Sequence, residues 1–239
     1  MKILIVTTSH DQLGNTGRKT GAWLEELAVP YYIFKGAGAD VTLASPLGGR
    51  IPIDPRSESI IASTPTIRRF QKDPDVASWL THSNALGTFK TTDFDMVFLP
   101  GGHAAIWDFP HNSHLIQLLE DFHRQDKILG LLSYAASVLV SMSTGDGEPF
   151  VKGKDLTAFS NSEEQLAGLT GIIPFSLESK LVASHAYYSK AADYVCHTVV
   201  NEHIVTGQNP ASAGEVAKKM LLLLKETSRN KPAVKSIPS

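Results

Sequence analysis

The chain has 239 residues, of which 42% are hydrophobic and 19% charged, with a formal net charge of -2 at pH 7. This length and composition suit one compact α/β domain and leave too little chain for two full domains. The nearly neutral charge gives no chain-wide electrostatic reason to bind nucleic acid or an anionic membrane. Small molecules or proteins are therefore the expected partners.

The apolar runs and the cysteine content of the sequence indicate where the protein is located and which kinds of site it can contain. No apolar run is long enough to span a bilayer, and the apolar start of the chain turns polar at Thr7, too early for the core of a signal peptide. We therefore expect a cytoplasmic protein. The single cysteine, Cys196, excludes an internal disulfide and a cysteine-rich zinc site. Neither a metal site nor a cofactor is predicted.

Short β-branched runs alternate with amphipathic stretches along the first part of the chain. Strands are expected at residues 2–8, 41–45, 96–100 and 128–132, and helices at 22–36, 114–125 and 135–140. This repeated βαβ order predicts a mostly parallel sheet with helices on both faces. In such folds, ligands bind outside the carboxyl ends of the strands.

The second part of the chain completes the same domain. The expected elements are a short run at 156–159, a helix near Glu163, a run at 198–205 and a closing helix at 212–227. A single domain then covers residues 1–227, with an insertion at about 49–91 whose helical pieces cover one edge. Residues 228–239 contain Lys, Pro and Ser and little apolar surface, which predicts a mobile tail.

Ser133 stands where the strand at 128–132 meets a helical segment, the place where α/β enzymes present a nucleophile beside helix amides. The strained turn at such a site is usually flanked by Gly or another very small residue. Here Leu131 precedes it and Ala135 follows it at the corresponding places. The chain thus keeps the location of a nucleophile while its chemistry looks altered.

Two further features point to the same edge of the sheet. Gly101 and Gly102 follow a predicted strand, so their backbone amides could face a ligand oxygen as in an oxyanion site, although such a turn is commonly only structural. Glu26 lies in an amphipathic stretch, where desolvation would favour its neutral form and suit a general acid or base. From spacing alone, a solvated helix glutamate remains the alternative.

Motifs over nearly the whole chain carry a family resemblance. They lie at residues 20–30, 37–38, 44–46, 48–49, 52–55, 57, 99–103, 107–108, 163–164, 174–175, 177–178 and 206–212. This set resembles the ThiJ/PfpI superfamily of class I glutamine amidotransferase-like proteins, in the branch with glyoxalase III-like enzymes and stress chaperones. The resemblance implies a flavodoxin-like three-layer sandwich, a homodimer, and a pocket built from Glu26, Gly101, Gly102 and the elbow at Ser133.

The sequence departs from the family pattern around that pocket. Where the family has Cys-His-Gly, this chain has Ser133, Tyr134 and Ala135, so both the thiol and the adjacent histidine are absent. A serine hydroxyl is far harder to deprotonate than a thiol, and Glu26 would have to act as its base. Loss of the thiol should largely abolish thiohemiacetal chemistry of the glyoxalase or deglycase type.

For each of three other side chains near the predicted pocket, two interpretations remain open. Tyr134 either offers its hydroxyl to a substrate oxygen or fills space. His185 replaces a family glycine and either carries protons in place of the lost histidine or is a surface residue. His103 follows the Gly-Gly turn and either contacts substrate or is structural.

Three functions follow from these features. The first is an enzyme without cofactor in which Glu26 moves protons on a small carbonyl-bearing or unsaturated metabolite, by hydration, dehydration, isomerisation or cyclisation. The second is a glyoxalase III-like or hydrolytic activity that uses Ser133. The third is a dimer without catalysis, acting as a chaperone or binding module. Retention of Glu26 and Gly101-Gly102 favours the first.

Overall fold

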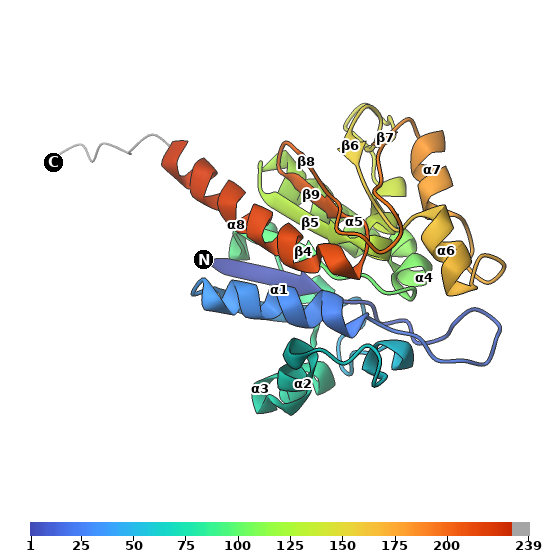
Figure 1. Cartoon of the computed structure of the whole chain (residues 1–239). Helices are drawn as coiled ribbons and strands as arrows, with labels where there is room; N and C mark the ends of the chain where they lie inside the picture. The colour runs from blue at the N-terminus through green and yellow to red at the C-terminus, as the bar shows by residue number, and fades with distance from the viewer. Residues whose placement is uncertain (231–239) are drawn as a thin grey trace, which may run out of the picture.

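A seven-stranded sheet forms the centre of the computed structural model, which describes residues 1–230 (Figure 1). The strand order is β3-β2-β1-β4-β5-β9-β8, with β8 antiparallel to β9 and the other pairs parallel. The strands are β1 (Lys2–Val6), β2 (Asp40–Ser45), β3 (Asn84–Ala85), β4 (Met96–Leu99), β5 (Ile128–Leu132), β8 (Thr198–Asn201) and β9 (Ile204–Gly207). The predicted mostly parallel α/β sheet is confirmed.

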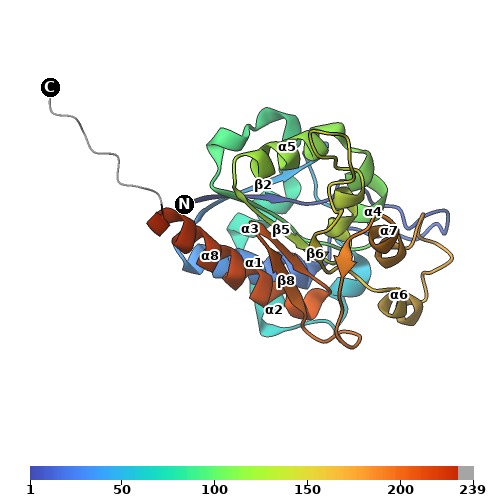
Figure 2. The same ribbon diagram turned by 90° about the horizontal axis from the view of Figure 1, so that it is seen from above.

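Helices cover both faces of this sheet. In Figure 2, α5 lies on one side and α1 and α8 lie together on the other. The α-helices are α1 (Leu24–Gly36), α2 (Pro65–Lys72), α3 (Pro74–Thr81), α4 (Ala105–Asp108), α5 (Ser113–Arg124), α6 (Asn161–Ala167), α7 (Leu177–Ala183) and α8 (Ala213–Asn230). The three-layer arrangement follows from a sheet that is apolar on both faces.

The side chains of strand β1 alternate between the two helical layers that cover the sheet. Leu4 and Val6 pack with α5 in one core cluster, whereas Ile3 and Ile5 pack with α1 and α8 in the other. Successive side chains of a strand point to opposite faces, so an unbroken apolar run is what a strand buried on both sides requires. Each such side chain contributes about 1.5–3 kcal/mol through burial.

Residues 49–91, which we predicted to be an insertion, contain helices α2 and α3 and lie at the edge of the sheet. Helices α2 and α3 pack below α1 in the view of Figure 1, and a 3₁₀ turn at Pro55–Glu58 leads toward them. The same segment also supplies β3, which pairs with β2. The periodicity did not predict β3, because two residues are too short to show an alternating pattern.

Two expected elements differ in the structure. The run at 156–159 contributes only β6 (Asp155–Leu156), which pairs with β7 (Tyr187–Tyr188) in a separate small sheet. The run at 198–205 is a hairpin of β8 and β9, since the chain reverses at Glu202, where φ is 53°. The β-branched residues on both sides of Asn201–His203, with no glycine or proline between them, hid this turn from the sequence pattern.

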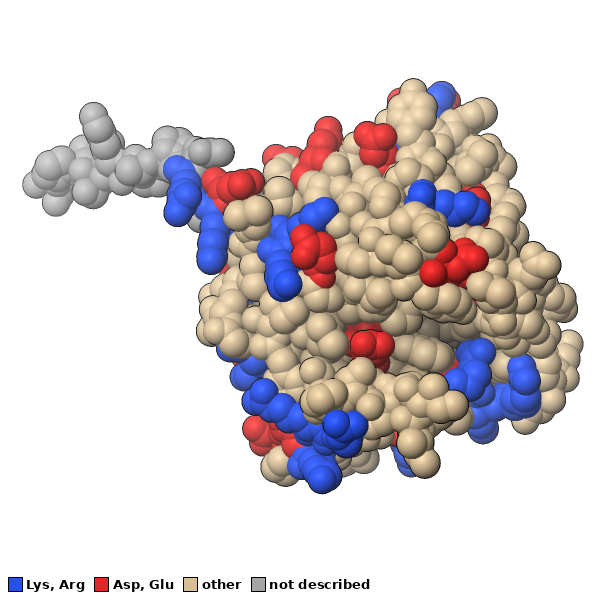
Figure 3. All heavy atoms as spheres, in the orientation of Figure 1, with Lys and Arg blue, Asp and Glu red and all other residues tan. Residues whose placement is uncertain are grey.

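The closing helix α8 reaches Asn230 and therefore includes the first residues of the predicted tail, whereas residues 231–239 lie outside the described residues. Within residues 1–230, no helix combines the length and apolar character needed to cross a bilayer. On the face seen in Figure 3, acidic and basic side chains are interspersed over a surface that is mostly uncharged.

Candidate active site

Neighbouring parallel strands β1, β4 and β5 end at the same edge of the sheet and bring three segments together. The chain leaves β4 into Gly101 and Gly102 and leaves β5 into Ser133. Helix α1 starts beside them, because the amide of Trp23 donates to the carbonyl of Gly101 over 3.1 Å. This edge is the topological switch point of the sheet, where such folds bind ligands.

Glu26 lies in the first turn of α1 with only 1% of its surface exposed. Its Oε2 accepts a hydrogen bond of 2.8 Å from the amide of Gly101. Desolvation raises the pKa of Glu26 to about 8, and the charges of Glu25 and Glu163 add to this, while hydrogen bonds from Gly101 and Ser133 oppose it. The alternative of a solvated helix glutamate does not describe this carboxyl group.

The bond to Glu26 changes the role expected of Gly101. The N–H group of Gly101 points to the carboxyl oxygen, so it is not directed at a ligand oxygen as the oxyanion interpretation required. A Cβ atom at this position would lie 2.6 Å from Oε2 of Glu26, 2.9 Å from Cβ of Ser133 and 2.5 Å from the carbonyl oxygen of Leu132. Glycine is needed here because three segments converge on one backbone position.

Ser133 begins a 3₁₀ helix, Ser133–Val140, directly after β5. Its φ of 56° is uncommon for a residue other than glycine and marks a strained strand-to-helix turn. The elbow therefore forms although Leu131 and Ala135 replace the small flanking residues that the sequence analysis looked for. Both of these flanking side chains are buried in the core on the α5 side of the sheet.

Glu26 and Ser133 face a common cavity of about 230 Å³. The cavity also contains Gly102 and His103 among its walls, so it gathers most of the predicted site. The lining residues are Trp23, Glu26, Arg56, Gly102, His103, Ser133, Phe159, Ala167, Tyr194 and Pro210. We refer to this space below as the Glu26 cavity.

Tyr134 and His185 do not line the Glu26 cavity. Tyr134 is buried behind the wall, where its ring lies 4.6 Å from that of His103 and 5.0 Å from that of Phe159. It therefore fills space and supports lining residues. His185 is exposed and follows α7 at a φ of 64°, with its amide bonded to the carbonyl of Val182.

The position of His185 explains the glycine that the family resemblance implied there. A helix commonly ends with one residue in the left-handed conformation, and glycine adopts it without strain. Because His185 serves this backbone turn and does not line the Glu26 cavity, the structure offers no path by which it would act as the histidine that the family resemblance implied beside position 133.

Sequence reasoning missed six of the residues that line the cavity: Trp23, Arg56, Phe159, Ala167, Tyr194 and Pro210. The carboxylate of Glu163 positions Tyr194 by accepting hydrogen bonds from its amide (2.8 Å) and from the side-chain amide of Asn209 (2.7 Å). Arg56, Glu163 and Asn209 all lie in or beside motifs that carried the resemblance, and that clustering was the available signal.

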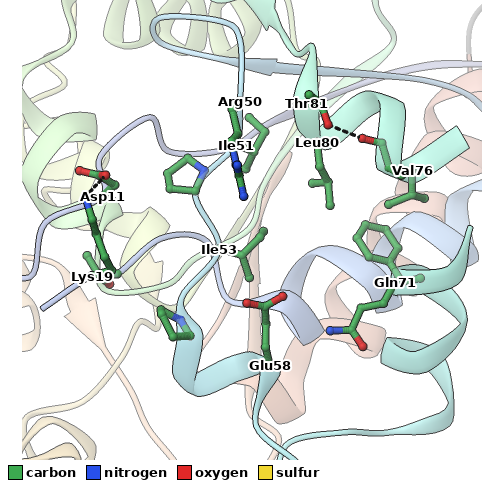
Figure 4. A pocket seen from close by; sticks show the side chains of 15 residues that line it. Asp11, Lys19, Arg50, Ile51, Ile53, Glu58, Gln71, Val76, Leu80 and Thr81 are labelled. Atoms are coloured by element: carbon green, nitrogen blue, oxygen red, sulfur yellow. Dashed lines mark hydrogen bonds and ion pairs between the residues drawn. The ribbon is translucent and has the colours of Figure 1, made fainter. Parts of the chain in front are cut away.

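A larger cavity, of about 800 Å³, lies between the loop at 11–20, the segment at 50–58 and helices α2 and α3. It contains none of the predicted site residues. Figure 4 shows Arg50 and Glu58 pointing into this space from opposite sides, with Ile51, Ile53 and Leu80 around it. Its charged side chains are exposed on the rim, as is typical of a hollow in the protein surface that is open to solvent.

Among the described residues, no three His, Cys, Asp or Glu side chains gather closely enough to hold a metal ion.

The site of this α/β protein combines a buried acid with a strained residue at a strand-to-helix turn, and the two share a cavity at the edge of the sheet. Comparison with known proteins identifies the family to which the chain belongs. The model of the DJ-1/PfpI family matches residues 20–223. This chain therefore belongs to the DJ-1/PfpI family.

Individual relatives agree with this assignment. The chain is 28% identical over 235 residues to the glutathione-independent glyoxalase hsp3101 of Schizosaccharomyces pombe, covering 91% of this chain and 93% of that protein. The X-ray structure of Rapid Encystment Protein 24 KDa from Francisella tularensis matches with a TM-score of 0.89 and 34% identity, over 93% of this chain and 98% of that one. Glyoxalase III of Candida albicans shares the fold, with a TM-score of 0.85 at 22% identity over 93% of this chain and 97% of that one.

Proposed function

We propose that this protein is an enzyme that uses Glu26, without a cofactor, to move protons on a small carbonyl-bearing or unsaturated metabolite. One observation carries the proposal: a carboxyl group with 1% exposure is held by Gly101 at the wall of a cavity large enough for a small molecule. Burying an acid in this way is costly, so a use for it at the cavity is favoured over a packing role.

The pKa of about 8 suits this chemistry. Near neutral pH, Glu26 is mainly protonated and can donate its proton to a carbonyl oxygen, yet its conjugate base forms readily. One group can therefore act as acid in one half of a proton transfer and as base in the other.

Relatives named as glyoxalases suggest which proton transfer to examine. A 2-oxoaldehyde exists in water as its hydrate, R–CO–CH(OH)₂. Removal of the C1 proton by the Glu26 carboxylate gives an enediolate, and return of a proton to C2 gives the hydroxy acid R–CH(OH)–COOH. Atoms balance in this isomerisation, and no bond to the protein forms, so the absence of a thiol at position 133 does not prevent it.

A second function keeps Ser133 as nucleophile. The strained φ of 56° and the hydrogen bond between Ser133 and Glu26 support it, since an activated serine needs a base within reach. In this alternative Ser133 would form a hemiacetal with the substrate, and Glu26 would take its proton.

Lactate formation from methylglyoxal by three variants separates the two mechanisms. Acid/base catalysis by Glu26 predicts a loss of at least about 100-fold in kcat for Glu26→Gln and less than about 10-fold for Ser133→Ala. The matched control is Glu25→Gln, which changes the adjacent helix residue outside the cavity; it removes only a smaller contribution to the raised pKa of Glu26 and should change kcat by less than about threefold.

Each outcome selects one mechanism. Equal losses in Glu26→Gln and Ser133→Ala would favour the nucleophilic alternative, because both members of a pair that acts as a unit are then required. Unchanged turnover in Glu26→Gln would remove the proposed function.

A further inference from the structure

Arg56 is held rigidly at the wall of the Glu26 cavity. Its Nε donates to Oδ1 of Asp54 over 2.9 Å, and its Nη2 donates to Oδ2 over 2.6 Å. Asp54 also accepts a 2.8 Å hydrogen bond from the hydroxyl of Thr20. Burial alone would raise the pKa of Asp54, but the hydrogen bonds and charge of Arg56 outweigh it and lower the pKa. The side chain of Arg56 is therefore fixed by an ionised partner.

His103 holds the same guanidinium from the other side. Nη2 of Arg56 lies 3.1 Å from Nδ1 of His103. Since arginine has no acceptor, Nδ1 must accept this hydrogen bond, which assigns the proton of the neutral ring to Nε2. Nε2 faces Oε2 of Glu164 at 3.6 Å. Nδ1 of His103 is thus occupied by Arg56, whereas Nε2 makes no hydrogen bond within residues 1–230, and we assign His103 to positioning Arg56.

The remaining nitrogen of Arg56, Nη1, carries two N–H donors. Within residues 1–230 no protein acceptor bonds to Nη1, while Arg56 lines the cavity beside Trp23, whose ring centre lies 5.8 Å from the guanidinium carbon. The Nε/Nη2 fork is occupied by Asp54, so Nη1 is left to offer its N–H donors to an anion such as a carboxylate, in a charge-assisted hydrogen bond of fixed direction.

Arg56 places one cationic group at the cavity surface, and Asp54 offsets part of its charge. Arg56 is the sole Lys or Arg among the residues that line it in the described chain. Asp54, its counter-ion, is completely buried behind it and is not a lining residue. Glu26 is mainly neutral below pH 8, so it places little negative charge in the cavity at neutral pH.

We propose that Arg56 is the anion-binding group of this cavity, and that the substrate is a carbonyl compound of a few carbons that also carries a carboxylate. The inference rests on the proposed function, since it specifies the substrate class of the same site. The volume of about 230 Å³ is below the range of about 300–1,000 Å³ that is typical of sites for drug-sized ligands, which limits the substrate to a small molecule.

The test is calorimetric binding of pyruvate and of pyruvamide, which has nearly the same shape but no charge. We expect the wild-type protein to bind pyruvate at least about tenfold more tightly than pyruvamide, and Arg56→Gln to abolish this preference. Arg56→Lys keeps the charge but loses the bidentate anchor to Asp54 that orients the side chain, and it should retain only part of the preference.

Two controls make the result specific. Arg50→Gln removes the same charge from the larger cavity of Figure 4, six residues earlier, and should leave both affinities unchanged. Asp54→Asn combined with Arg56→Gln avoids leaving a buried carboxylate unpaired, and it should lose the preference in the same way if the single variant folds poorly. Circular dichroism and thermal melting report whether each variant is folded.

Equal binding of pyruvate and pyruvamide, no binding of either, or an equal loss in Arg50→Gln would overturn the inference. Failure of the proposed function gives a different result. If Glu26→Gln leaves turnover unchanged while pyruvate still binds through Arg56, the anion site stands and the assigned catalyst is wrong. If methylglyoxal turnover depends on Glu26 but pyruvate does not bind, the catalyst stands and the carboxylate class is wrong.

Discussion

The two cavities beside the segment at 50–58 differ in construction more than in size. The larger one, of about 800 Å³, has an apolar floor and an exposed rim that includes the Asp11–Lys19 pair. The Glu26 cavity, of about 230 Å³, has the buried polar side chains of Glu26, His103 and Ser133 in its wall, and hydrogen bonds of Glu26 and His103 join distant segments.

This difference indicates which of the two cavities is held in shape by interactions within the protein. Water can replace the contacts of an exposed pair at little cost, whereas a buried carboxyl group, such as that of Glu26 or Asp54, needs its protein partners. Volume alone would select the larger cavity as the functional site. The placement of buried polar groups selects the smaller one, and the following predictions test that contrast.

The largest expected effect is the pH dependence of stability caused by Glu26. Its pKa of about 8 in the folded protein lies above the model value of 4.5, so the folded state retains a proton that the unfolded state loses. Stability should therefore fall between pH 4.5 and 8 by roughly 4 to 5 kcal/mol from this group. Urea unfolding at several pH values should show a flatter profile for Glu26→Gln than for wild type or Glu25→Gln, and parallel profiles would contradict the buried position.

Gly101→Ala tests how tightly the Glu26 cavity is packed. Its new Cβ would meet Leu132, Glu26 and Ser133 within 2.5–2.9 Å, so we expect a loss of about 3 kcal/mol in the free energy of unfolding together with loss of turnover. Gly145→Ala is the control, because nothing lies within 4 Å of its Cβ position. Similar urea midpoints for the two variants would show that the convergence at Gly101 is looser than described.

Asp54→Asn tests the ion pair that holds Arg56 at the wall of the Glu26 cavity. Asp54 is fully buried, whereas 37% of the Arg56 side chain is exposed, so loss of this charge should cost about 2 kcal/mol and not the full penalty of a completely buried pair. The variant should also weaken pyruvate binding at least about threefold, because Arg56 loses its fixed orientation. A stability loss without any change in pyruvate affinity would mean that Asp54 does not position Arg56.

The smallest effect is expected at the rim of the larger cavity. Lys19 and Asp11 form a 2.5 Å pair with 57% and 46% of their side chains exposed. Asp11→Asn should cost less than about 1 kcal/mol and leave turnover unchanged. A loss comparable to that of Asp54→Asn, measured in the same urea titrations, would remove the contrast between the two regions.

Local pattern predicted the elements that lie in the middle of the sheet. The strand at 128–132 was placed with the bounds that the structure has, because an unbroken apolar run between polar residues is typical of a strand buried on both faces. The same rule failed at 198–205, where a tight turn at Glu202 carries no glycine or proline to mark it.

The sequence by itself determined the α/β sheet, the elbow at Ser133 and the candidacy of Glu26, because apolar periodicity and local motifs report burial and strand ends. Only the tertiary structure decided that the amide of Gly101 serves Glu26, that His185 caps a helix, and that Arg56 reaches the cavity. These facts depend on which distant segments meet, and hydrogen-bond partners far apart in the chain leave no periodic signal in it.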